Sequence, residues 1–402
     1  MKQAFFQRLW NSLIWRSTNL EDPLTTINGY SLIDIFGGSA TNAGETVSEK
    51  TAMTFSAVWR STQIISGIIG ALPFKIYRNT DSGREEAKDH PYWEVITKSP
   101  NSTQTKAVFW QRAINHYLNW GNFFAEIKRN VVPVIELIHP ARFRKIEKNT
   151  RGNLVFVFDW DQGIERRIRQ DNLIHVPNLG DEIIGKGIIA QAREDIGLEF
   201  ARQKYGSQYF KDGGKTKAFI STDQILKADQ RKDLAEWIRT QKQAGHDLIL
   251  DSGFKYAATS IPPEDSQFLG TGDFSVATIA RWYGVPKSKL AHSEDPTFAN
   301  IENMGIEFLT DTISPIISKI EDEFDAKLFD KEYCEFDMNA YLRGDMKSKA
   351  EYYTKMVNAG LMTINEVRRK ENLNKIENGD RPIVQGAMTF LDKLGTQPAK
   401  NA

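Results

Sequence analysis

Two predicted helices that enclose a small insert constrain the fold of this chain more than any other feature. The stretch "IIAQAREDIGLEFARQKYGSQYF", residues 188–210, has the length of one long helix, and Gly213 and Gly214 are placed to end it, because glycine is favoured just beyond a helix end. A further helix is expected from about Glu264 to Tyr283. The insert between them has about 50 residues, a size that packs stably only with outside help. We therefore expect an oligomer.

The insert has its own pattern of short elements. A strand, "KAFIST", comes first, and a charged helix is expected from Asp223 to about Lys242. Two further strands, "DLILD" and "FKYAATSI", follow, and Pro262 and Pro263 close the insert.

The first half of the chain indicates an α+β fold. One helix is expected over residues 54–72, with Thr54 as its N-cap and Pro73 at its end, and another over about 104–119, where Gly121 turns the chain. The predicted strands are apolar or alternating: "FKIYR", "NFFAEIKR", "VIELIHP", "LVFVFDW", "IERRIRQ" and "NLIHVPN". Two helices against antiparallel strands make an α+β unit.

The rest of the sequence is expected to be mostly helical. Residues 287–299, "KSKLAHSEDPTFA", form a polar loop, and a long helix follows to about residue 329. Pro315 should kink this helix, because proline removes a backbone hydrogen bond. From Glu332 the chain is expected to be helical and polar, with a disordered tail, "QPAKNA".

Near the end of this region, "NAGLMTINEVRRKENL" predicts a helix-turn-helix. Thr363 as N-cap and Glu366 three residues later form a capping box. Gly360 is placed to end the preceding helix.

Length and charge limit the possible functions. A chain of 402 residues suggests two or three structural units. The 52 basic and 52 acidic residues cancel, so the totals show no net basic face for gripping nucleic acid, and any DNA contact must be local or loose. Cys334 has no partner for an intramolecular disulfide, and a buried, inert thiol is expected.

The N-terminus, "MKQAFFQRLWNSLIWRS", predicts an amphipathic arm. Its basic residues alternate with apolar ones at helical spacing: Lys2, Arg8 and Arg16 among Phe5, Phe6, Leu9, Trp10, Leu13 and Ile14. This spacing differs from the unbroken apolar run of a signal peptide. We expect the arm to dock on a neighbouring subunit or on its own domain; a membrane-surface helix is the alternative. The sequence predicts no membrane-spanning stretch.

Two glycine motifs resemble nucleotide-binding loops without completing them. In "YFKDGGKTKAF" the position five residues before the second glycine is Tyr209, and a helix leads in where a phosphate-binding loop needs glycine and a strand. "GKGIIA", residues 185–190, matches a dinucleotide-binding pattern, but the strand before it is too distant. We expect a structural helix start there, and no ATPase.

No catalytic, cofactor or metal site is predicted. The six histidines are scattered, and His139 and His175 at predicted strand ends are expected to pack rather than to bind zinc. "HSED", residues 292–295, has metal-binding side chains but no evident supporting partners. "IEDEFD", residues 320–325, is best interpreted as a solvated helix face. A serine or cysteine nucleophile motif is also missing.

The order of short motifs resembles the portal (head-to-tail connector) proteins of long-tailed bacteriophages over about residues 50–385. The similar segments, in chain order, are "GNFFAEIKRN", "VIELIHPARF", "LIHVPN", "IIGKGIIAQA", "YFKDGG", "ILDSGFKYAATSIPPEDSQFL", "IARWYGVPKSKL", "TFANIENMGIEFLTDTISPIISKIEDEF" and "NAGLMTINEVRRKENL". None is decisive alone, but nine in the same order make chance a poor explanation.

This resemblance implies the portal fold, an α+β fold with wing, stem, clip, tunnel loop and crown regions assembled as a ring. The implied regions are 1–187, N-terminal arm and α+β wing; 188–211, stem helix; 212–263, clip; 264–286, second stem helix; 287–299, tunnel loop; 300–331, kinked channel or wing helix; and 332–402, C-terminal helical wing or crown and tail.

The resemblance also implies a structural role rather than an enzymatic one. Family members form rings of twelve subunits at one capsid vertex of the virion, and the terminase motor drives double-stranded DNA through them. The implied partners are further copies of the chain, the DNA, the large terminase subunit, head-tail adaptor proteins and a major capsid or scaffold protein, with assembly in the host cytoplasm and no membrane. The alternatives are a phage head connector without a DNA channel, or a nucleotide-binding enzyme.

Candidate contact residues follow from the implied regions. The tunnel loop that would face DNA contains His292, Ser293, Glu294, Asp295, Pro296, Thr297 and Phe298. The stem and clip candidates for DNA, motor or adaptor contacts are Lys204, Lys211, Lys215 and Lys217, with intersubunit salt bridges as the alternative. The acidic helix 300–329 would repel DNA if it lined the channel; otherwise it is a solvated or intersubunit face.

Two departures from the family pattern concern backbone continuity. Gly270 and Gly272 stand in the second stem helix where the family usually carries charged residues, and each costs about 1 kcal/mol in a helix interior. Pro133 replaces a common hairpin glycine, so that turn is expected to differ.

Overall fold

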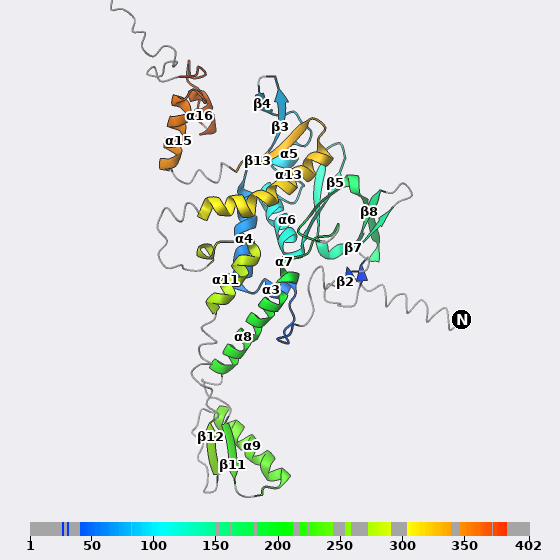
Figure 1. Cartoon of the computed structure of the whole chain (residues 1–402). Coiled ribbons are helices and arrows are strands. Elements are labelled where there is room, and N and C mark those ends of the chain that lie inside the picture. The colour runs from blue at the N-terminus through cyan, green and yellow to red at the C-terminus, as the bar shows by residue number, and fades with distance from the viewer. Residues whose placement is uncertain are drawn as a thin grey trace, which may run out of the picture. The chain divides into compact units, whose positions relative to one another are not determined.

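The computed structural model in Figure 1 contains helices and small sheets in two compact units. Unit one comprises Met1–Ala71 and Ile76–Cys334, and unit two comprises Leu72–Lys75 and Glu335–Ala402. The structure describes residues 26–27, 30–31, 41–81, 83–148, 153–160, 163–180, 183–211, 218–222, 225–243, 254–258, 272–290, 304–338, 346–371 and 373–383. The predicted N-terminal arm and disordered tail lie outside these residues.

The helices are divided between the two units. Those of unit one are α3 (Glu49–Ala52), α4 (Ser56–Ala71), α5 (Trp93–Thr97), α6 (Lys106–Trp120), α7 (Ile188–Gln191), α8 (Arg193–Lys211), α9 (Ala228–Gln243), α11 (Gly272–Tyr283) and α13 (Ser314–Leu328). Shorter turns are η1 (Pro140–Arg142), η3 (Gln170–Asn172), η4 (Lys287–Lys289) and the π-helical η5 (Leu309–Ile313). Unit two has α15 (Met346–Asn358) and α16 (Ile364–Lys370).

The strands form five small sheets within the described residues. They are β1 (Thr26–Ile27), β2 (Tyr30–Ser31), β3 (Phe74–Thr80), β4 (Gly83–Glu86), β5 (Asn122–Lys128), β6 (Val134–Ile138), β7 (Phe143–Lys148), β8 (Leu154–Asp159), β9 (Glu165–Arg169), β10 (Leu173–Pro177), β11 (Ala218–Thr222), β12 (Phe254–Ala258) and β13 (Glu332–Phe336). The sheet orders are β1-β2, β10-β5-β6, β11-β12, β13-β3-β4 and β7-β8-β9. With the helices, they confirm the predicted α+β class.

Helices α4 and α6 pack together in the core of unit one. Both were expected from their apolar stripes, and both end near the predicted residues, α4 before Pro73 and α6 at Gly121. A side chain at Gly70 would lie 3.0 Å from the Ala107 carbonyl oxygen, so the two helices approach closely there. Thr54 is not the N-cap of α4, because the helix begins at Ser56, and the Thr54 hydroxyl donates to the Thr51 carbonyl.

The two central sheets share a core rich in phenylalanine. Strand β5 is buried along most of its length and pairs with β10 on one side and β6 on the other. A hydrophobic core beside β5 joins α6 and the β10-β5-β6 sheet to the β7-β8-β9 sheet. Its residues are Trp120, Phe124, Ile138, Phe143, Phe156, Phe158, Ile168 and Leu173. The pattern did not predict β7, because "FRKIEK" carries four charged residues in six positions.

Strand β13 corrects the prediction of helix from Glu332. Cys334 and Phe336 are buried and alternate with half-buried neighbours, which is the period of a strand. The ring of Phe336 stacks on that of Phe74 with centroids 4.0 Å apart. The Arg78 side chain donates a hydrogen bond to the Glu332 carboxylate, which is 254 residues away in sequence, so no local pattern predicts this pairing. Cys334 is buried as expected, and burial raises the pKa of its thiol.

The insert contains the two predicted outer strands and the charged helix. Strands β11 and β12 pair antiparallel over five residue pairs, from Ala218 with Ala258 to Thr222 with Phe254. Helix α9 begins at Ala228, later than the predicted Asp223. The predicted strand "DLILD" lies outside the described residues. Helix α11 begins at Gly272, and the region around Gly270 also lies outside them.

The long helix with the central proline contains a π turn. The Ser314 backbone N–H donates to the Leu309 carbonyl, five residues back, directly before Pro315. A proline ring clashes with the carbonyl four residues earlier in an α-helix, and the wider turn relieves this crowding. The kink expected at Pro315 stays a prediction, and the feature found directly before the proline is this π turn.

In unit two, the helix-turn-helix prediction is confirmed. Helix α15 ends at Asn358, and Gly360 has the left-handed φ of +71°. Thr363 and Glu366 form the expected capping box: the Thr363 hydroxyl accepts from the Glu366 N–H and the Glu366 carboxylate accepts from the Thr363 N–H.

Candidate functional site

Several of the sequence motifs meet at Gly121, where α6 turns into β5. The Asn178 N–H donates to the Gly121 carbonyl at 2.8 Å, which joins the end of β10 to this turn. Gly121 has φ of +75°, and a β-carbon there would lie 2.3 Å from the Lys186 carbonyl carbon. Only glycine satisfies both demands, because the position needs a left-handed backbone and has no space for a side chain.

Asn122 fastens the loop before α7 to the start of β5. Its side-chain amide donates to the Gly185 carbonyl at 2.8 Å, and its Oδ1 accepts from the Gly185 N–H at 2.9 Å. The Nε2 of His175 lies 3.0 Å from the same Oδ1. Because an amide oxygen only accepts, this contact places the histidine proton on Nε2.

His175 is a structural residue inside strand β10, rather than at the strand end as predicted. Its ring stacks on Phe124 with centroids 4.6 Å apart. Burial lowers the pKa of His175 to about 3, with a further contribution from Lys327. The imidazole is therefore neutral at physiological pH, which fits the expected packing role.

The glycines of "GKGIIA" allow backbone to pack on backbone. A β-carbon on Gly185 would lie 2.3 Å from the Gly121 carbonyl oxygen, and one on Gly187 would lie 2.3 Å from the Asn119 carbonyl oxygen. Gly187 is the N-cap of α7. The expected structural helix start is confirmed, since the glycines are occupied by this packing.

A second cluster joins helices α4, α6 and α11 at Asn119. The Tyr283 hydroxyl donates to Asn119 Oδ1 at 2.5 Å, and Asn119 Nδ2 donates to Thr62 Oγ1 at 3.2 Å. Asn119 is fully buried. Burial also raises the pKa of Tyr283, so its hydroxyl stays protonated as the donor.

The chain beyond α11 is tied to the π turn. Gly284 has φ of +65°, and its carbonyl accepts from the Thr312 hydroxyl at 2.7 Å. The Val285 N–H donates back to the Ala280 carbonyl at 2.9 Å, which ends α11. The two segments that flank residues 291–303 are thus bonded to each other.

Helices α8 and α11 are linked by the buried carboxylate of Glu199. This carboxylate accepts from Ser275 Oγ of α11 at 2.7 Å and from Arg202 and Gln203 of its own helix. Burial alone would raise the pKa of Glu199, but hydrogen bonds from Arg202, Ser275 and Gln203 lower it. The carboxylate is therefore charged and fully bonded, which suits a structural contact.

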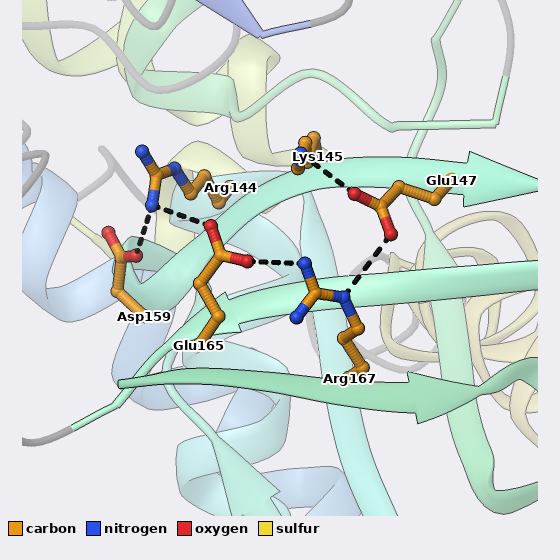
Figure 2. Close-up of polar contacts among 6 residues, drawn as sticks. All are labelled: Arg144, Lys145, Glu147, Asp159, Glu165 and Arg167. Atoms are coloured by element: carbon orange, nitrogen blue, oxygen red, sulfur yellow. Dashed lines mark hydrogen bonds and ion pairs between the residues drawn. The ribbon is translucent and has the colours of Figure 1, made fainter. Parts of the chain in front are cut away.

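The outer face of the β7-β8-β9 sheet carries a continuous chain of ion pairs, drawn in Figure 2. Its members, in order, are Asp159, Arg144, Glu165, Arg167, Glu147 and Lys145. Glu165 is central, because it pairs with Arg144 at 2.9 Å and with Arg167 at 2.6 Å. Three acids balance three bases, so this face joins the strands without presenting excess charge.

A β-bulge places Arg144, one of the two arginines of this network. The register of β7 on β8 shifts between Phe143 and Lys145, so Arg144 is the additional residue. Phe143 is buried in the core, while Arg144 reaches Asp159 and Glu165 of the outer face. Without the bulge, strict alternation would carry Lys145 to the core side.

The candidate lysines are only partly placed by the structure. Lys204 of α8 pairs with Glu45 at 2.7 Å, so in the single chain it has an acidic partner. Lys211 is the exposed last residue of α8. Lys215, Lys217 and the loop residues 292–298 lie outside the described residues, as does the "HSED" stretch.

The acidic helix predicted over residues 300–329 makes contacts within the chain. Neither the predicted channel-lining role nor the predicted solvated or intersubunit face included them. Glu323 accepts from the His175 N–H at 2.8 Å and pairs with Lys327 at 2.5 Å. Asp325 accepts from the Cys334 N–H at 2.8 Å. These two carboxylates therefore dock α13 on β10 and β13.

Two buried asparagines escape sequence-based prediction. Asn119 occupies a position in α6 surrounded by apolar neighbours, and only that mismatch signals a role. Asn365 lies in the recognised "TINEVRR" segment, where its side chain bonds both the N–H and the carbonyl of Ile376 at 2.9 Å. Its own N–H donates to the Gly379 carbonyl, which holds the following loop on α16.

The described part of the chain shows no cluster of three or more histidine, cysteine, aspartate or glutamate side chains suited to a metal ion. Among the same residues, none of the helices combines the length and apolar character needed to cross a membrane.

Comparison with known proteins gives a consistent result. Residues 56–372 match the family model described as phage portal protein. The chain is 26% identical over 374 residues to the portal protein of Enterobacteria phage HK97, with 88% of each chain covered. It is 25% identical over 365 residues to the probable portal protein of Streptomyces phage phiC31, covering 85% of this chain and 79% of that protein.

Solved structures show the same fold. The crystal structure of an HK97 family phage portal protein from Corynebacterium diphtheriae has a TM-score of 0.57 at 14% identity, covering 74% of this chain and 98% of that one. A chain from the neck of a native gene transfer agent particle, computed with C12 symmetry, has a TM-score of 0.53 at 16% identity, covering 86% and 93%.

The family match defines the chain as a structural component of a virion rather than an enzyme. The chain belongs to the phage portal protein family, since the family match spans most of its length.

Proposed function

We propose that this protein forms a closed ring of twelve copies at one capsid vertex, through which double-stranded DNA is packaged and later ejected. The observation that carries the proposal is the match to the portal family over residues 56–372. It is supported by the fold's likeness to chains in gene transfer agent necks, whose structures were computed with C6 and C12 symmetry. A closed ring also explains why a small insert can persist, since neighbouring copies would cover it.

The charge balance suits a conduit. Equal numbers of acidic and basic residues give no net basic grip, and strong neutralisation of phosphates would hold the DNA by counterion release. A passage that lets DNA slide needs weak, scattered contacts. In the ion-pair network around Glu165, acidic and basic side chains likewise neutralise one another.

We assign the regions by the family resemblance. Helices α8 and α11 would form the stem, the insert with β11, α9 and β12 the clip, and residues 287–299 the tunnel loop. The partners would be the large terminase subunit, head-tail adaptors and a capsid or scaffold protein, with assembly in the host cytoplasm.

Two groups of residues are proposed to make contacts. The loop His292 to Phe298 would face DNA, so its deletion should leave ring assembly intact while impairing packaging or DNA retention. Lys215 and Lys217 would contact motor or adaptor at the clip. Reversal of both charges should alter motor docking or adaptor binding. If neither changed, the assignment of these lysines as contacts would be wrong.

Native mass spectrometry of the purified protein tests the ring directly. The proposal expects a discrete species whose mass equals twelve copies of the chain, the number suggested by the C12 neck. A protein that stayed monomeric across a wide range of concentration and salt, alone and with its scaffold partner, would contradict it.

A further inference from the structure

Helix α8 presents an exposed apolar stripe between two covered faces. Leu198 and Tyr205 are seven residues apart, so they lie on the same side of the helix two turns apart. Leu198 is 56% exposed and Tyr205 is 42% exposed. Large apolar side chains repeated along one face of a surface helix mark a site where another element binds.

One neighbouring face of α8 is covered by the segment just before α3. Gly197 packs against Thr41 so tightly that a β-carbon there would lie 2.5 Å from the threonine side chain. Farther along, Lys204 pairs with Glu45 at 2.7 Å. Residues 41–45 therefore lie directly on α8, and their contact Gly197 is one residue away from Leu198 in the helix sequence.

The other neighbouring face is covered by α11. Ser275 bonds Glu199, and the indole N–H of Trp282 donates to Asp195 at 2.8 Å. Trp282 itself is 40% exposed, so its ring forms an apolar border on this side. The stripe of Leu198 and Tyr205 thus lies in the strip of α8 that α11 and residues 41–45 leave open.

The N-terminal segment has the complementary chemistry. Residues 2–16 carry apolar side chains at helical spacing, three basic residues and no acidic ones. The open strip begins beside Glu194 and Asp195, in the first turn of α8. Apolar surface would meet apolar surface, and the basic residues would meet the acidic end of the strip.

The connection is long enough for the segment to reach α8 of its own chain. Residues 17–40 number 24, and because β1 and β2 fold back on each other within them, the nine residues on either side of that hairpin span about 60 Å at full extension. Because Thr41 already lies on α8, the effective concentration of the segment beside its own helix is high. The arm of a neighbouring copy starts from a Thr41 that lies on another α8, so its path to this helix is longer.

We propose that residues 2–16 dock as an amphipathic helix along the Leu198 and Tyr205 stripe of α8 in the same chain. The docked segment covers apolar surface that the rest of the described chain leaves exposed. This inference goes beyond the portal role, and it rests on the proposed ring in one respect: neighbouring copies must leave this strip of α8 open.

Cysteine cross-linking in the full-length protein tests the proposal. Cys334 is replaced by alanine, and Trp10→Cys is combined with Leu198→Cys or, as the matched control, with Ser207→Cys. Ser207 is exposed on the side of α8 that faces away from Leu198. A short bismaleimide should give several-fold more intrachain product for the Leu198 pair. Equal yields for both pairs, or products only between chains, would overturn the proposal.

Limited trypsin digestion gives a second measurement without cysteines. Cleavage after Arg8 and Arg16 should be slow in the unmodified protein and several-fold faster when Leu198→Asp and Tyr205→Asp are combined. Ser207→Asp serves as the control and should leave the rate unchanged. Unchanged cleavage in the double variant would refute the docking, and so would protection that arises only when anionic lipid vesicles are added.

Discussion

Asn122 and Gly185 exchange two hydrogen bonds across 63 residues of sequence, one at 2.8 Å and the other at 2.9 Å. This pair joins the turn after α6 to the loop that starts α7 and α8. The recognised motifs around both residues are therefore explained by backbone packing rather than by a ligand. In a portal ring, such junctions would keep α7 and α8 fixed relative to β5.

Replacing Asn122 by alanine should destabilise the protein by about 2–3 kcal/mol, because the buried N–H and carbonyl of Gly185 lose their partner. Urea unfolding at constant pH measures the change. Asn130→Ala, in the exposed connection between β5 and β6, is the control and should be near neutral. Equal effects from the two substitutions would argue against the clamp.

Gly121→Ala should be far more damaging than Gly163→Ala. The two glycines have nearly the same φ, +75° and +76°, but a β-carbon at Gly163 meets nothing within 4 Å, whereas one at Gly121 meets backbone at 2.3 Å. Gly163→Ala should cost about 1–2 kcal/mol from left-handed strain alone. Gly121→Ala should cost more than that or prevent folding, as measured by thermal unfolding and soluble yield. Similar stabilities would show that the junction can open.

Stability should fall as the pH drops from about 6.5 toward 3, with two buried histidines contributing. Burial lowers the pKa of both His116 and His175 to about 3, while an unfolded histidine titrates near 6.5. Between these values the unfolded state binds more protons, so each histidine removes about 1.4 kcal/mol per pH unit. The proton-linked loss starts below the unfolded pKa and is complete near pH 3.

A variant with His116→Leu isolates this effect, since His116 is buried in α6 and its Nδ1 has no hydrogen-bond partner. Its unfolding free energy should fall less steeply with acid than that of the unmodified protein. His246, which lies outside the described residues, supplies a comparison as His246→Leu. Parallel pH profiles for all three proteins would exclude a titrating role for His116.

Glu165→Gln should weaken the charged face of the β7-β8-β9 sheet by about 1 kcal/mol, because it removes the carboxylate shared by Arg144 and Arg167. The loss should shrink in high salt, which screens partly exposed pairs. Asp171→Asn, which removes the exposed pair with Arg169, should have little effect at any salt concentration. A Glu165 effect independent of salt would indicate packing rather than charge.

Local signals in the sequence predicted the elements whose determinants lie close together in the chain. Helix α6 was predicted from its apolar stripe and ended at Gly121, and the capping box of Thr363 and Glu366 formed as expected. The order of motifs identified the family, because each motif reflects a local structural requirement. One example is the glycine that precedes α7.

Long-range pairing could not be predicted from such signals. Strand β13 was expected to be helical because its partner β3 lies far away in sequence, and β7 was hidden by the charges of its outer face. The bonding of Asn119 to Thr62 and Tyr283 depends on three helices meeting. The DNA-facing loop and two of the candidate lysines remain predictions, because they lie outside the described residues.

Electron microscopy of the purified protein is the most direct test of the conduit. Class averages should show closed rings of twelve subunits with a central bore wide enough for a DNA duplex, in keeping with the family and with the C12 neck. Monomers that fail to close even with the scaffold partner, or compact assemblies without a bore, would contradict a DNA passage and leave a head connector of another kind.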